Sequence, residues 1–199
     1  MSQNSAETFG IARRLIDNVY LFWAALAVPA VYILVQYFIL HGRVAYVPLT
    51  GDLSGWLLIV TMMITPLMLL LGPLPWLKAR RRYLGVASFG YALLHLAYWL
   101  SGATVGVLIR SFARPDILAG WIAMGLMVLL AITSNDLSVR KMGVKWKTLQ
   151  RWIYPVAILT LLHWVFTSHA LFSVAVYTVP LILLSIWRLL RQRSRKYRV

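Results

Sequence analysis

Two histidines stand in the middle of long apolar segments, and they are the residues of this chain best suited to chemistry. His95 lies in the stretch YALLHLAYWL, and His163 lies in the stretch YPVAILTLLHWVF. An ionisable side chain within a membrane-length apolar segment is costly and generally has a function. A single histidine of this kind can also serve only to hydrogen-bond a neighbouring helix, so the two have to be interpreted together.

Both histidines are expected at the same depth in parallel helices. With about 12 residues before His95 and about 11 before His163, a rise of about 1.5 Å per residue places each imidazole roughly 16–18 Å from the inner end of its helix. Two neutral imidazoles that face each other across a helical bundle can form the axial pair of a haem iron. A zinc site would need further ligands at this level, and the sequence offers none there.

The other candidate residues have simpler interpretations. His41 and His169 fall at the outer ends of apolar segments, and we interpret them as interfacial polar residues, with a role at the cofactor or at a docking surface as the alternative. Trp99 and Trp164 are interpreted as packing residues, with the edge of a haem as the alternative. Small residues near the two central histidines could let a macrocycle approach or could serve helix packing; they are Gly85, Ala87, Ser88, Gly90, Ala92 and Ala157. Four methionines within the apolar segments are interpreted as core; they are Met62, Met63, Met124 and Met127.

The composition is that of an integral membrane protein. Of the 199 residues, 61% are hydrophobic and 13% are charged, and the mean hydropathy is +0.75. Soluble domains are nearer 45–50% apolar. The net charge of +15 comes from basic residues between apolar segments, so it does not indicate a nucleic-acid-binding face. The absence of cysteine excludes disulfides, iron–sulfur clusters and covalently attached c-type haem.

The apolar segments predict an all-α fold, an integral membrane six-helix bundle. The first 18 residues are polar and do not resemble a signal peptide, so the first apolar segment is expected to remain as a span. We expect a cytoplasmic N-terminal segment at 1–18, a six-span domain at 19–190 and a basic cytoplasmic tail at 191–199. The expected spans are residues 19–40, 56–77, 83–108, 117–134, 152–167 and 171–190.

The basic residues predict that both termini are cytoplasmic. Of the 20 Lys and Arg residues, seventeen fall in one set of connections and termini, and three fall in the other set. The three are Arg43, Arg110 and Arg114. The larger set comprises Arg13 and Arg14, the segment 78–82, the segment 140–151, and Arg188 with the basic residues of the C-terminal tail.

Two blocks of the sequence resemble a known family. The first is ITPL followed by RRYLGVASFGYALLHL, and the second is AITSNDLSVRKMGVKWKTLQRWIYPVAILTLLHW. Together they resemble the ferric-reductase-like transmembrane superfamily, most closely the haem-binding membrane subunits of bacterial periplasmic methionine sulfoxide reductase systems. The resemblance covers roughly residues 56–164, more than half of the chain.

The resemblance implies a haem-binding bundle, but this sequence matches only one of the family's two haem sites. In this superfamily, four histidines on two helices hold two stacked b haems. The two histidines on each helix are 13 or 14 residues apart in sequence. His95 and His163 match the outer pair. Arg81 and Gln150 stand where the inner pair is expected, and neither side chain is an ordinary ligand of haem iron. We therefore expect His95 and His163 to bind the iron of a single haem b.

Without the inner pair of histidines, another carrier has to deliver electrons to the haem. A membrane quinol, a flavin such as FMN on the inner surface, or a docked cytoplasmic protein could take the place of an inner haem. The basic segments 78–82 and 140–151 could bind a flavin phosphate, or they could only set topology and contact anionic lipid.

The leading interpretation is a b-type cytochrome subunit of the bacterial inner membrane that passes electrons to an outer-side redox partner, such as a periplasmic methionine sulfoxide reductase. The chain carries no nucleotide-binding motif, so we expect an electron-transfer subunit rather than a complete enzyme. The alternatives are an accessory membrane subunit with one or no haem, and a quinol- or metal-handling reductase that uses one haem.

Overall fold

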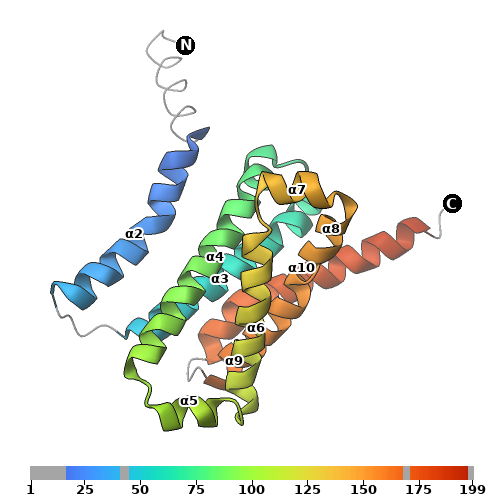
Figure 1. The fold of residues 1–199 in the computed structure, drawn as a ribbon. Helices are drawn as coiled ribbons and strands as arrows, with labels where there is room; N and C mark the ends of the chain where they lie inside the picture. The colour runs from blue at the N-terminus through green and yellow to red at the C-terminus, as the bar shows by residue number, and fades with distance from the viewer. Residues whose placement is uncertain (1–16, 41–44, 168–170, 197–199) are drawn as a thin grey trace. The chain divides into compact units, whose positions relative to one another are not determined.

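The computed structural model describes residues 17–40, 45–167 and 171–196, and every element within them is an α-helix (Figure 1). This confirms the expected all-helical fold. His41 and His169 lie outside the described residues. The helices are α2 (Val19–Phe38), α3 (Tyr46–Leu71), α4 (Pro75–Gly102), α5 (Val105–Ser111), α6 (Pro115–Ile132), α7 (Asp136–Met142), α8 (Val144–Gln150), α9 (Ile153–Thr167) and α10 (Leu171–Lys196).

The chain divides into two units, Met1–Tyr46 and Val47–Val199. The first unit contains α2, which begins at a side-chain cap: Asn18 Oδ1 accepts hydrogen bonds from the backbone amides of Tyr20 at 2.8 Å and Leu21 at 3.3 Å. Asparagine is among the preferred residues at this position because it satisfies amides that have no partner within the helix. Half of the large apolar side chains of α2 are exposed, as expected of a helix with a face toward lipid.

The second unit is a bundle in which α6 and α9 lie side by side, α4 packs against α6, and α10 packs against α9. Figure 1 shows the short helix α5 at one end of this bundle and α7 and α8 at the opposite end. One core cluster joins four helices through Leu58 of α3, Ala92 of α4, Met127 of α6 and Val156 of α9. A second cluster joins α3, α9 and α10, and it includes Trp164.

Small polar residues bring α3 and α4 together. Ser54 Oγ donates to the carbonyl of Ser88 at 2.9 Å, and Ser88 Oγ donates to the carbonyl of Ser54 at 2.8 Å. Both side chains are buried. Small residues and shared hydrogen bonds are the usual means of helix association where lipid removes the hydrophobic driving force. Ser88 therefore serves helix packing.

Three helix boundaries differ from the sequence-based prediction. Helix α3 begins at Tyr46 rather than at residue 56, because its first turns carry Gly51 and Asp52 and read as polar in sequence. It ends at Leu71, before Gly72, whose φ of 98° is left-handed and favours glycine. Helix α4 ends at Gly102 rather than at residue 108, and α5 follows as a separate helix.

The first basic segment is also placed differently. Residues 78–82 were expected in a connection, but they lie in the first turns of α4, which begins at Pro75. Proline is favoured at the first position of a helix, and arginine side chains can cover apolar surface along their length. Arg80 is buried and lies over the ring of Trp76, with its guanidinium carbon 5.4 Å from the ring centroid.

Within the described residues, four helices are long and apolar enough to cross a membrane: α2, α3, α4 and α6. Helix α9 has 15 residues, which is shorter than a full span of roughly 20 residues. The apolar part of α10 is Val174–Arg188. The chain is thus a multi-pass membrane protein, while the full count of six spans stays a prediction.

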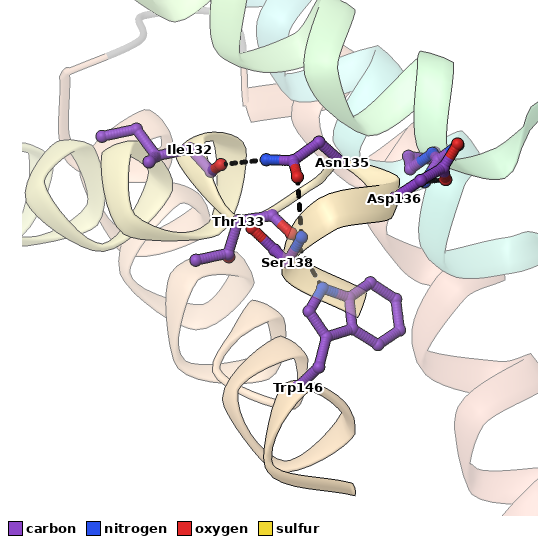
Figure 2. A network of polar contacts seen from close by, with 7 residues as sticks. Ile132, Thr133, Asn135, Asp136, Ser138 and Trp146 are labelled. Atoms are coloured by element: carbon purple, nitrogen blue, oxygen red, sulfur yellow. Dashed lines mark hydrogen bonds and ion pairs between the residues drawn. The ribbon is translucent and has the colours of Figure 1, made fainter. Parts of the chain in front are cut away.

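The corner between α6 and α7 is closed by polar contacts, which Figure 2 shows from close by. Asn135 Nδ2 donates to the carbonyl of Ile132 at 2.7 Å, and Asn135 Oδ1 accepts from the amide of Ser138 at 2.8 Å. Trp146 Nε1 donates to the carbonyl of Thr133 at 2.8 Å and so ties α8 to the end of α6.

Asp136 joins this corner to α4. Its carboxylate lies 2.6 Å from Arg82 Nη1, and the hydrogen bond from this guanidinium holds the pKa of Asp136 below its usual value. The Asp136 side chain is 74% exposed, so the pair contributes little to stability. The cap at Asn135 therefore matters more for holding α7.

Replacing Asn135 by alanine should loosen α7, because the amide of Ser138 and the carbonyl of Ile132 both lose a partner. Loss of such a cap costs about 1 kcal/mol, which corresponds to roughly fivefold faster hydrogen exchange over this helix. Deuterium uptake by peptides covering Asp136–Met142 measures this. Ser138→Ala is the matched control, since it keeps the amide donor; equal uptake in the two variants would contradict the assignment.

Candidate functional site

The two central histidines meet inside the second unit. The ring centroids of His95, on α4, and His163, on α9, lie 6.1 Å apart, and the ring planes are inclined by 79°. Both side chains are half-buried. The structure therefore brings together the two residues that the sequence placed at one depth.

Each imidazole is held by a backbone carbonyl of a neighbouring helix. His95 Nδ1 lies 2.9 Å from the carbonyl oxygen of Val47 on α3, and His163 Nδ1 lies 2.8 Å from the carbonyl oxygen of Asp116 on α6. A carbonyl oxygen can only accept, so Nδ1 carries the proton in both rings. The unprotonated nitrogen is then Nε2, whose lone pair is available to a metal.

Trp164, the residue after His163, is fixed by a hydrogen bond to α3. Its Nε1 donates to Asp52 Oδ1 at 2.9 Å, and the residue is 8% exposed. A Cβ atom added to Gly55 would lie 3.0 Å from the Trp164 ring, so this glycine lets the indole pack close to α3. Trp164 thus connects α9 to α3 next to His163, and its interpretation as a packing residue is consistent with these contacts.

The donor set fits a haem better than a free metal ion. The ring centroids lie 6.1 Å apart, which is close enough for both imidazoles to bind one metal ion with metal–nitrogen bonds of about 2 Å. Within the described residues, no group of three or more His, Cys, Asp or Glu side chains could hold a metal ion. Haem iron needs only two axial ligands from the protein because the macrocycle supplies the other four.

A cavity of about 440 Å³ lies farther along α4, toward α7 and α8. It is lined by both residues that stand at the expected inner positions, Arg81 and Gln150, and by Gly85. Four further basic side chains reach its wall; they are Lys78, Arg82, Lys147 and Arg151. Phe89, Trp146 and Tyr154 add aromatic surface.

Both inner residues are engaged with neighbouring helices. Arg81 Nε donates to the carbonyl of Thr61 at 3.2 Å, and its Nη1 donates to Thr65 Oγ1 at 3.1 Å. Gln150 Nε2 lies 3.3 Å from the carbonyl of Leu130 and 3.2 Å from Thr133 Oγ1. These contacts use donor atoms, and neither side chain offers a lone pair suited to iron.

The remaining sequence candidates have packing roles. Trp99 makes an edge-to-face contact with Trp121 at 6.1 Å between centroids. All four core methionines pack in the two clusters, as expected; they are Met62, Met63, Met124 and Met127. Sequence reasoning missed the carbonyls of Val47 and Asp116, because a backbone acceptor carries no signature in residue type.

Comparison with known proteins shows the family of this chain. The family described as "Ferric reductase like transmembrane component" matches residues 50–161, which include His95 and end before His163. Several relatives carry the name "Protein-methionine-sulfoxide reductase heme-binding subunit MsrQ". No solved structure matches the chain.

Three of these relatives illustrate the similarity. The protein of Brucella anthropi is 33% identical over 143 residues, which are 69% of this chain and 64% of the relative. The protein of Azospira oryzae is 36% identical over 154 residues, which are 72% of this chain and 66% of the relative. The protein of Yersinia pseudotuberculosis is 33% identical over 157 residues, which are 75% of this chain and 77% of the relative.

The match spans slightly less than two thirds of the length of the first two relatives. The family match covers more than half of this chain, and it includes most of both sequence blocks that carried the resemblance. This chain belongs to the ferric reductase-like transmembrane family.

Proposed function

We propose that this chain is a membrane electron-transfer subunit that holds one b-type haem between His95 and His163. The observation that carries the proposal is the pairing of the two imidazoles at 6.1 Å, each with Nδ1 bound to a carbonyl and Nε2 left for coordination. The name of the relatives, a heme-binding subunit, supports the same cofactor. The bound haem would supply reversible one-electron chemistry at its iron.

The residues around the pair hold the ligands in place. The carbonyls of Val47 and Asp116 fix the tautomer and limit rotation of the rings. Trp164, the residue after His163, is buried and anchored to Asp52 of α3, so it holds α9 against α3 at this level. Fixed ligands in surroundings of low dielectric favour electron transfer because little has to rearrange when the charge changes.

The cavity around Arg81 and Gln150 is the candidate site for electron entry from the inner side. Its basic rim, which includes Lys147 and Arg151, would attract the phosphate of a flavin nucleotide such as FMN. A membrane quinone is the second candidate carrier, and the apolar and aromatic walls of the cavity suit its ring. In either case the inner half of the bundle would hold a different carrier in place of a second haem.

The outer partner follows from the relatives. Their name links the subunit to a protein-methionine-sulfoxide reductase, so we propose an outer-side redox protein of this kind, with the subunit located in the bacterial inner membrane. The proposed topology has six spans between residues 19 and 190, with the polar segment 1–18 and the basic tail 191–199 in the cytoplasm. The seventeen-to-three distribution of basic residues supports it.

Replacing either central histidine by alanine should remove the haem or convert it to a high-spin form. One iron ligand is lost and a cavity opens beside the macrocycle, so the two effects add. Absorption spectra of the purified variants measure the low-spin signal and the haem content together. We expect less than about a tenth of the low-spin haem of the unaltered protein in each variant, in line with the affinity changes of metal sites.

His41→Ala and His169→Ala are the matched controls, although both residues lie outside the described part of the structure. Both should keep the low-spin spectrum, since neither residue belongs to the central segments of the sequence. If an outer substitution abolished the low-spin signal while His95→Ala kept it, the ligand assignment would be wrong.

Reporter fusions should place position 199 in the cytoplasm and the connection at 41–45 outside, because the basic residues gather on the cytoplasmic side. The second reporter belongs at 41–45 since α3 already begins at Tyr46. Alkaline phosphatase should be active only at 41–45, and a cytoplasmic fluorescent reporter only at 199. The reverse pattern would overturn the orientation.

A further inference from the structure

The same local arrangement holds each central histidine. Helix α3 starts at Tyr46 and α6 starts at Pro115, and in both helices the carbonyl of the second residue accepts the Nδ1 hydrogen bond. In both helices a glycine follows four residues after that carbonyl: Gly51 after Val47, and Gly120 after Asp116.

Helix geometry explains why these positions matter. The Cα–Cβ bond tilts toward the N-terminus of a helix, so the side chain at one position lies over the carbonyl four residues earlier. Serine and threonine use this proximity to bond the same carbonyl with their own hydroxyl groups. A glycine leaves the second lone pair of that carbonyl open to a group from another helix.

The imidazoles occupy the space that a side chain would need. A Cβ atom added to Gly51 would lie 2.9 Å from His95 Nδ1 and 3.2 Å from its Cε1. A Cβ atom added to Gly120 would lie 2.9 Å from His163 Nδ1 and 3.1 Å from its Cε1. These separations are shorter than van der Waals contact, so any residue larger than glycine forces the ring away from its carbonyl.

We propose that Gly51 and Gly120 are positioning residues for the two haem ligands, an inference that rests on the function proposed above. Each glycine opens one helix carbonyl to the Nδ1 proton of one histidine, and the bond fixes both the ring orientation and the tautomer. A carbonyl bound to Nδ1–H also makes Nε2 a more basic ligand and favours the oxidised iron.

The first arm of the test uses the holoprotein and compares Gly51→Ala and Gly120→Ala with Gly125→Ala. Gly125 lies on α6 like Gly120, and a Cβ atom there meets nothing within 4 Å. Alanine is the better helix former, so all three substitutions favour the helix itself. We expect a more positive midpoint potential and a haem affinity lower by about tenfold or more for the first two variants only. Potentials and affinities equal to those of Gly125→Ala would overturn the inference.

The second arm needs no haem and guards against variants that fail to fold. Nitrogen-15 NMR of the full-length, haem-free chain with labelled histidine reports which ring nitrogen carries the proton. His95 and His163, assigned by their loss in His95→Gln and His163→Gln, should both be protonated at Nδ1. Protonation at Nε2 in both rings would overturn the inference.

The two arms separate this inference from the proposed function. If His95→Ala and His163→Ala lose the low-spin haem while both glycine variants behave like Gly125→Ala, the ligand assignment stands and the positioning role is wrong. If both histidine variants keep the low-spin haem, the proposed function itself fails. If the Nδ1 tautomers are found in the same protein, the hydrogen bonds to Val47 and Asp116 stand nevertheless.

Discussion

Hydrogen bonds from polar side chains to carbonyls of neighbouring helices are the interaction on which this bundle depends. Water is absent from the hydrocarbon region, so a polar group there must find its partner within the protein. His95 and His163 bind carbonyls of α3 and α6 in this way, and Arg81 and Gln150 bind carbonyls of the same two helices farther along. Helices α3 and α6 thus act as supports for the side chains of the segments that follow them.

This constraint gives the two ends of the bundle different chemistry. At His95 and His163 the hydrogen bonds use the proton on Nδ1 and leave Nε2 free, so both side chains keep a ligand atom. At Arg81 and Gln150 the hydrogen bonds use guanidinium and amide protons, and no ligand atom suited to iron remains. The same mode of support therefore accompanies the proposed haem site in one half and a basic cavity of about 440 Å³ in the other.

The sequence predicted that His95 and His163 lie at one level of the bundle, because the number of apolar residues before each histidine sets its position along its helix. It identified the all-helical fold, the family, and the common level of His95 and His163. It misplaced the start of α3, because polar residues such as Asp52 interrupt the hydropathy signal while the helix continues. It also placed residues 78–82 in a connection, although they begin α4. The roles of Gly51 and Gly120 could not be predicted, since they depend on a ring contributed by another helix.

The most direct test of a single haem held by His95 and His163 is a spin-quantified electron paramagnetic resonance spectrum of the purified, oxidised protein. Near-perpendicular imidazole planes, inclined here by 79°, give a strongly anisotropic low-spin ferric signal, whereas parallel planes give a more rhombic one. One bis-histidine haem per chain should give a single strongly anisotropic low-spin species, with about one spin per chain. Two low-spin species per chain, or a spectrum that is entirely high-spin, would contradict it.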